Sequence, residues 1–135
     1  MIVVDANILA YYYLPGQFTT AARAVMRKDP DWVAPLLWRS ELRSVLTGYL
    51  RREELNLHDV RRIQSEAEDL MCDNEYEVDS ASVLDLAYRC DCSAYDCEYV
   101  ALALQLGTRL VTMDARVLRA FPQVATPLPS TPSRS

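Results

Sequence analysis

The amino-acid sequence predicts an α/β domain with a central parallel sheet of four to five strands flanked by helices. Short apolar runs with the character of strands alternate with longer stretches in which apolar residues recur at helical spacing. Connections between parallel strands are right-handed and place helices on both faces of such a sheet. Half of the 135 residues are hydrophobic, which is enough for the core of one compact domain.

The expected elements are bounded by residues that favour turns and caps. Strands are expected at residues 2–5, 32–35, 75–78 and 109–112, and helices at residues 6–14, 19–28, 36–52, 58–72, 81–90, 95–106 and 115–121. Pro15 and Gly16 separate the first helix from the second, and the Asp-Pro-Asp sequence at 29–31 forms a turn before the second strand. Gly107 is placed to cap the sixth helix.

The packed domain is expected to span residues 1–126. From Pro127 the composition turns to proline and serine, so the segment 127–135 is interpreted as a mobile tail that lacks the apolar residues needed to pack. The opening run is too short for a signal peptide, and no apolar stretch reaches the roughly 18 residues of a membrane span. These features predict a soluble, cytoplasmic protein without membrane contact.

Four acidic residues stand where an exposed carboxylate is least expected. Asp5 and Asp114 follow apolar strand-like runs, whereas Glu41 and Asp96 fall on apolar faces of expected helices. Open α/β sheets bind ligands at the edge where their parallel strands end. Carboxylates gathered in a partly dehydrated pocket stay ionised only when a cation neutralises them. The pattern therefore predicts a site for Mg²⁺, a hard ion that prefers oxygen ligands.

Helix capping is the alternative explanation for three of these acids. Asp5 and Asp114 each precede a helix, and capping alone accounts for them as well as metal binding does. Ser93 and Asp96 have the spacing of a capping box, a role that is compatible with ligation. Glu41 has no such alternative, because the residues on its helix face are apolar. Capping does not require the four acids to occur together, which favours a shared site.

The charge balance argues against nucleic-acid binding by bulk electrostatics, because the chain carries a net charge of −5. The objection weakens if bound metal cancels several acids and if the cations are concentrated locally. Thirteen of the 14 basic residues are arginine, and several lie between residues 39 and 62. Arginine suits phosphate recognition, so Arg39 and Arg43 are candidate RNA phosphate contacts. For the arginine pairs at 51–52 and 61–62, a solvated helix face is the simpler explanation.

The four cysteines lie in the second half of the chain and are expected to be free thiols in a reducing compartment. They are Cys72, Cys90, Cys92 and Cys97. Their spacing does not match a C-x₂-C zinc site, and the single histidine, His58, lies elsewhere in the sequence.

Four segments carry the acids and their polar neighbours. They are Ile2-Val-Val-Asp5-Ala-Asn7, Ser40-Glu41, Ser93-Ala-Tyr-Asp96-Cys-Glu-Tyr99-Val-Ala-Leu-Ala103 and Leu110-Val-Thr112-Met-Asp114. In order, spacing and setting they resemble PIN-domain ribonucleases, and more narrowly VapC toxins of type II toxin–antitoxin pairs. The resemblance covers nearly the whole chain except the proline-rich tail, and it implies a PIN-domain-like three-layer sandwich.

The resemblance also implies roles for individual residues. The residues implied to bind Mg²⁺ or Mn²⁺ and to be catalytic are Asp5, Glu41, Asp96 and Asp114, with Asn7, Ser93 and Thr112 as supporting polar groups. The implied activity is that of an endoribonuclease that hydrolyses RNA phosphodiester bonds with metal-activated water. The implied partners are RNA, a small VapB-like antitoxin that lays a helix in a groove, and a second copy in a homodimer. Tyr11, Tyr12, Tyr13 and Trp38 are candidates to line that groove or to stack on bases, although core packing is the simpler explanation for most of the tyrosines.

Two other functions are compatible with parts of this pattern. Aspartyl-phosphate hydrolases also place acids at strand ends, but they use a catalytic lysine, and the only lysine here, Lys28, lies in a helical stretch. A non-cleaving PIN-like module that binds RNA or protein is the remaining alternative. Retention of all four acids speaks against such a scaffold, because clustered charges without a ligand destabilise a fold.

Overall fold

The computed structural model of the protein describes residues 1–130 and contains a five-stranded parallel sheet in the order β3-β2-β1-β4-β5. The strands are β1 (Ile2–Val4), β2 (Trp32–Pro35), β3 (Glu75–Tyr76), β4 (Leu110–Val111) and β5 (Ala125–Thr126). β1 lies at the centre, where Val3 pairs with Val33 of β2 on one side and with Leu110 of β4 on the other. The predicted α/β class with a parallel sheet is confirmed.

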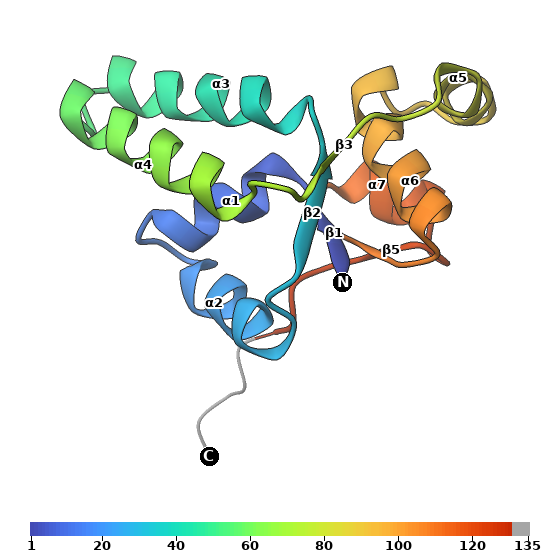
Figure 1. Ribbon diagram of the computed structural model, residues 1–135, viewed down its shortest axis with the longest axis horizontal. Helices are drawn as coiled ribbons and strands as arrows, with labels where there is room; N and C mark the ends of the chain where they lie inside the picture. The colour runs from blue at the N-terminus through green and yellow to red at the C-terminus, as the bar shows by residue number, and fades with distance from the viewer. Residues whose placement is uncertain (131–135) are drawn as a thin grey trace.

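Helices cover the sheet from both sides (Figure 1). Within the described residues they are α1 (Ala6–Tyr13), α2 (Thr19–Lys28), α3 (Trp38–Arg51), α4 (Leu57–Leu70), α5 (Ser80–Arg89), α6 (Ala94–Leu106) and α7 (Ala115–Ala120). In the view of Figure 1, α1 to α4 lie to one side of the strands and α5 to α7 lie to the other, so the sheet forms the middle layer.

The core is built on the apolar central strands. Every residue of β1 and of β2 is buried, as expected for parallel strands with helices on both faces. Helix α6 contacts β1, β2 and β4, and its run from Tyr99 to Ala103 is buried throughout. A helix that is apolar on nearly all sides belongs inside the molecule, and α6 is held there by the sheet on one side and α5 on another.

The helix boundaries follow the capping signals in the sequence. Asp5, Asn56, Asp79, Ser93 and Asp114 are N-cap residues whose side chains accept a hydrogen bond from a backbone N–H in the first turn. Gly107 ends α6 in the left-handed conformation, with φ of 66°, as its expected role as a C-cap requires. Asp5 and Asp114 thus have the capping function proposed as the alternative explanation for them.

Two differences from the predicted elements lie at the sheet edges. The strand expected at 75–78 is limited to Glu75–Tyr76, and β5 was not expected as an element of its own. Leu128 is 5% exposed and belongs to the hydrophobic core, so the expectation that the chain does not pack beyond residue 126 is wrong for this residue. Residues 131–135 of the expected tail lie outside the described residues.

No helix among residues 1–130 has the length and apolar character needed to cross a membrane. The carboxyl ends of β1 and β4 are neighbours in the sheet, since Val4 pairs with Val111. The residues that follow these two strands therefore emerge side by side at one edge, next to the amino-terminal end of α6, which packs on both strands.

Candidate active site

A cavity of about 230 Å³ opens at this edge of the sheet and brings the four predicted acids together. It is lined by Asp5, Ala6, Asn7, Glu41, Ser44, Val45, Asp96, Tyr99, Leu110, Thr112, Asp114 and Val117. The acids come from four separate places: the end of β1, the first turn of α3, the first turn of α6 and the loop after β4. The topology of the sheet, rather than closeness in sequence, is what assembles them.

Asp5 is held in place by hydrogen bonds from both sides. Its Oδ1 accepts the backbone N–H of Ile8 at 3.1 Å, which caps α1, and its Oδ2 accepts the hydroxyl of Thr112. Burial raises the pKa of Asp5 from 3.8 to about 6, and the hydrogen bond from Thr112 opposes this shift. Asp5 is therefore a fixed carboxylate whose negative charge is poorly solvated.

Thr112 connects the two acids that follow strands. Its buried hydroxyl donates to Asp5 and accepts the backbone N–H of Asp114 at 3.1 Å. Asp114 is exposed, and its Oδ1 accepts the N–H of Val117 at 3.1 Å to cap α7. Asp114 thus offers its other oxygen toward solvent at the mouth of the cavity.

Ser93 and Asp96 form the predicted capping box at the start of α6. The Ser93 hydroxyl accepts the N–H of Asp96 at 3.0 Å, and Asp96 Oδ2 accepts the N–H of Ser93 at 3.3 Å. Ser93 is exposed and does not line the cavity, but it fixes the backbone from which Asp96 projects. Capping and cavity lining therefore coexist at Asp96, as they do at Asp5 and Asp114.

Glu41 reaches the cavity from α3 and meets Tyr99 of α6. The Tyr99 hydroxyl donates to Glu41 Oε1 at 2.5 Å. Burial raises the pKa of Glu41, the hydrogen bond from Tyr99 opposes that effect, and the charges of Asp96 and Glu98 raise the pKa further. The expected inward orientation of Glu41 is what places its carboxylate in this recess.

The donor set of the cavity suits a hard divalent cation. In the described part of the chain, no lysine, arginine or histidine lines the cavity, so four carboxylates face it without a basic partner. Oxygen ligands of this kind are those that Mg²⁺ and Mn²⁺ take, and a cation would relieve the unfavourable charge on Asp5 and Glu41. Among residues 1–130, no three acidic, histidine or cysteine side chains stand close enough together to ligate one ion as they are placed.

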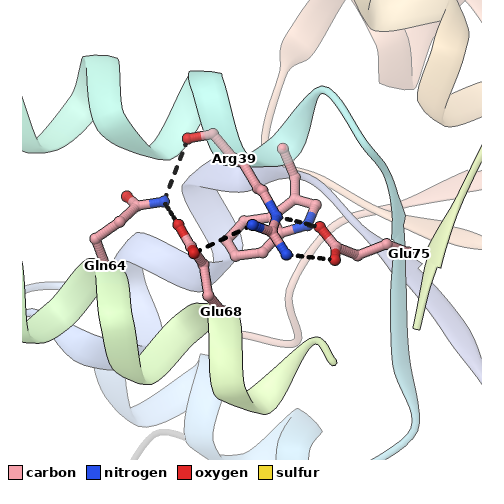
Figure 2. Close-up of polar contacts among 5 residues, drawn as sticks. Arg39, Gln64, Glu68 and Glu75 are labelled. Carbon is pink, nitrogen blue, oxygen red and sulfur yellow. Dashed lines mark hydrogen bonds and ion pairs between the residues drawn. The ribbon is translucent and has the colours of Figure 1, made fainter. Parts of the chain in front are cut away.

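Arg39, predicted as an RNA phosphate contact, has its guanidinium paired with carboxylates of the same chain. Its guanidinium forms a two-pronged ion pair with Glu75, at 2.6 and 2.7 Å, and a third contact with Glu68 at 3.2 Å (Figure 2). Gln64 also donates to Glu68 and to the backbone carbonyl of Arg39. The donors of Arg39 that were expected to contact RNA phosphate are engaged with carboxylates, and Arg39 does not line the cavity.

Arg43 remains a candidate phosphate contact. It is an exposed residue of α3, two positions after Glu41. It lines a separate groove of α3 and α4 together with Arg61, and not the acidic cavity itself.

Two polar residues of the cavity were missed by sequence reasoning, namely Tyr99 and Ser44. Tyr99 lies in the apolar run of α6 and has the spacing of a core aromatic, and Ser44 is an exposed residue of α3. Glu98, an acid that had no expected role, lines a different cavity of about 400 Å³ beside β3 and α5.

The cysteines are free thiols, as expected. The sulfurs of Cys90 and Cys97 lie 3.7 Å apart where α5 gives way to α6. Burial raises the pKa of the Cys92 and Cys97 thiols to about 12, which keeps both protonated at neutral pH.

Comparison with known proteins agrees with this geometry. The chain is 26% identical over 139 residues to a protein of Pyrobaculum aerophilum named Ribonuclease VapC3, with 93% of this chain and 98% of the relative covered. Its fold is similar to that of PAE2754 from the same organism, with a TM-score of 0.75 and 19% identity over 94% of this chain and 90% of the other. It is also similar to a chain in the structure of FitAcB from Neisseria gonorrhoeae, with a TM-score of 0.72 and 17% identity over 93% and 96% of the two chains. The sequence model of the PIN domain matches residues 2–125, and the chain therefore belongs to the PIN domain family.

Proposed function

We propose that the protein is a metal-dependent endoribonuclease and the toxin of a VapC-type toxin–antitoxin pair. The observation that carries the proposal is the cavity in which four carboxylates from four separate segments meet without a basic partner among the described residues. Membership of the PIN domain family and the similarity to a protein named Ribonuclease VapC3 support the same conclusion.

The residues proposed to hold the metal ion are those whose carboxylates line the cavity: Asp5, Glu41, Asp96 and Asp114. A bound Mg²⁺ or Mn²⁺ ion would supply Lewis acidity that polarises the scissile phosphate and lowers the pKa of an attacking water. The pKa of Asp5, raised by burial, means that its anion is poorly solvated in the absence of a cation. That unfavourable state provides a driving force for cation binding.

The supporting residues keep the carboxylates oriented before substrate arrives. Thr112 holds Asp5 from one side while the first turn of α1 holds it from the other. Ser93 fixes the first turn of α6, from which Asp96 projects. Because these side chains are fixed by backbone and hydroxyl groups, less reorganisation is needed when charge develops on the phosphate in the transition state. Asn7 is exposed on the first turn of α1 and lines the cavity, which supports its proposed role as a further supporting polar group.

The proposal includes partners of the kind implied by the resemblance. We propose that the protein pairs with a small antitoxin that blocks the acidic cavity and that it forms a homodimer. One similar chain belongs to the structure of FitAB bound to an IR36 DNA fragment, with a TM-score of 0.70 and 17% identity.

A cleavage assay tests the proposed activity. Purified protein is incubated with structured and single-stranded RNAs in Mg²⁺, Mn²⁺ or EDTA, and we expect cutting only when metal is present. Asp5→Asn and Asp96→Asn should each reduce the rate by more than the roughly 10- to 100-fold that is typical for residues that merely support a metal site. Both variants should remain folded, since asparagine also caps helices.

Asp79→Asn is the matched control for these two variants. Asp79 caps α5 in the way that Asp5 caps α1, and it accepts the N–H of Ser82 at 3.0 Å, but it does not line the cavity. Its replacement should leave the rate unchanged. Cutting that survives both cavity variants would exclude the proposed site, and absence of cutting on every RNA would favour the alternative of a non-cleaving PIN-like module that binds RNA or protein.

A further inference from the structure

Tyr99 joins two segments of the cavity, α6 and α3, through one buried hydroxyl. The side chain is 3% exposed and belongs to α6, one turn after Asp96. Its hydroxyl donates to Glu41 Oε1 at 2.5 Å. The hydroxyl therefore contacts an element other than its own, α3, which carries one of the proposed ligands.

Packing alone does not require this hydroxyl. A phenylalanine would fill the same volume between α6 and the sheet, whereas a buried tyrosine oxygen must find hydrogen-bond partners to offset its desolvation. In the described residues, the bond from Tyr99 is the one side-chain hydrogen bond that Glu41 receives. Without this bond, no side-chain hydrogen bond among the described residues would orient the Glu41 carboxylate.

We propose that Tyr99 is a positioning residue of the metal site. Its hydroxyl orients the Glu41 carboxylate relative to that of Asp96, so that both carboxylates can bind the same divalent ion. This inference rests on the proposed function. Tyr99 acts through Glu41 and does not contact the ion, in the manner of the outer residues that orient metal ligands in other proteins. One oxygen of Glu41 is occupied by Tyr99, which leaves Oε2 for the ion.

The test is Tyr99→Phe, measured by calorimetric titration of the protein with Mn²⁺ alone. We expect Mn²⁺ affinity to fall by about 10- to 100-fold. The matched control is Tyr13→Phe, which removes a hydroxyl from a half-buried tyrosine of α1 that does not line the cavity, and it should leave Mn²⁺ affinity unchanged. Thermal unfolding in EDTA separates a loss of stability from a loss of metal binding.

A second pair of variants tests whether Tyr99 acts through Glu41. In a Glu41→Ala background the Tyr99 hydroxyl has no carboxylate to orient. Adding Tyr99→Phe should therefore change Mn²⁺ affinity by less than about twofold. The affinity of these weaker variants is measured by water proton relaxation at millimolar Mn²⁺. Wild-type affinity in Tyr99→Phe, or an equal loss in both backgrounds, would overturn the inference while the metal site stands. If the wild-type protein binds no Mn²⁺, the proposed metal site itself fails, and the inference fails with it.

Discussion

Asp5 is a residue at which function and stability oppose each other. Its carboxylate accepts hydrogen bonds from Ile8 and Thr112, yet burial raises its pKa to about 6. A raised pKa means that the folded protein binds the proton of Asp5 more tightly than the unfolded chain does. The associated stability is fully present below pH 3.8 and is lost as pH rises through about 6. At neutral pH the metal-free protein therefore bears the cost of an ionised, poorly solvated carboxylate.

Asp5→Asn should consequently be more stable than the wild type at pH 7 in EDTA, although it is expected to be inactive. The shift of about two pKa units corresponds to a gain of up to about 3 kcal/mol. The gain should shrink as the pH falls from 7 toward 4, because wild-type Asp5 then becomes protonated as well. Urea unfolding at several pH values measures this difference. A variant less stable than the wild type at pH 7 would show that the cavity does not strain Asp5.

Sequence reasoning found the four acids because each breaks a local pattern. Asp5 and Asp114 end apolar strand runs, and Glu41 interrupts an apolar helix stripe, so their positions are visible without a structure. Tyr99 breaks no pattern, since an aromatic residue is at home in an apolar helix. Its partner lies 58 residues away on another helix, and only the tertiary fold shows that its hydroxyl meets a carboxylate.

At the scale of elements, the ion pairs of Arg39 anchor α3 to α4 and to the edge strand β3. Glu75 of β3 accepts two bonds from Arg39 and one from the indole N–H of Trp38, which is fully buried. This anchor orients the amino-terminal turn of α3, from which Glu41 projects. The sequence did not reveal these ion pairs, because Glu68 and Glu75 lie 29 and 36 residues further along the chain, where no periodic pattern relates them to α3.

Glu75→Ala tests the importance of this anchor. It leaves the buried indole N–H of Trp38 without its acceptor, which should reduce stability by about 1–3 kcal/mol. Glu66→Ala is the matched control, because Glu66 pairs with Arg62 on the exposed face of α4, and such pairs contribute about 0.3–0.5 kcal/mol. Chemical denaturation of both variants in EDTA gives the comparison. Equal effects would mean that the Glu75 contacts contribute no more than a surface pair.

The strand predictions show which elements can be inferred from sequence and which cannot. β1 and β2 are continuous apolar runs, so they were readily identified. β5 has only two residues, Ala125–Thr126, and is too short to show any periodicity. It forms because β4 offers an edge for pairing, with Leu110 opposite Ala125, and this is a property of the assembled sheet. Leu128 also packs into the core, although it lies between prolines, and its backbone N–H donates to the Met113 sulfur at 3.3 Å.

At the scale of the whole molecule, the parallel topology accounts for the site. Because β1 and β4 are adjacent and run in the same direction, Asp5 and Asp114 emerge at one edge despite a separation of more than 100 residues. The four acids of the cavity at that edge are part of a net charge of −5, which opposes the approach of a polyanion such as RNA. Under the proposed function, RNA binding would then depend on the metal ion and on local arginines rather than on the overall charge.

Arg43→Gln tests whether a local cation or the overall charge controls RNA association. Arg43 is exposed on α3, two positions after Glu41. If Arg43 contacts a phosphate, its loss should weaken RNA binding. The slope of the logarithm of the RNA association constant against the logarithm of salt concentration should then become smaller in magnitude by about 0.7. Arg89→Gln, on α5, removes the same charge at another exposed position and should change the slope little. Both are measured by fluorescence anisotropy with labelled RNA in an Asp96→Asn background, where cutting is not expected. Equal losses of RNA affinity in the two variants would show that net charge causes the effect. Unchanged RNA affinity in Arg43→Gln would show that Arg43 does not contact RNA.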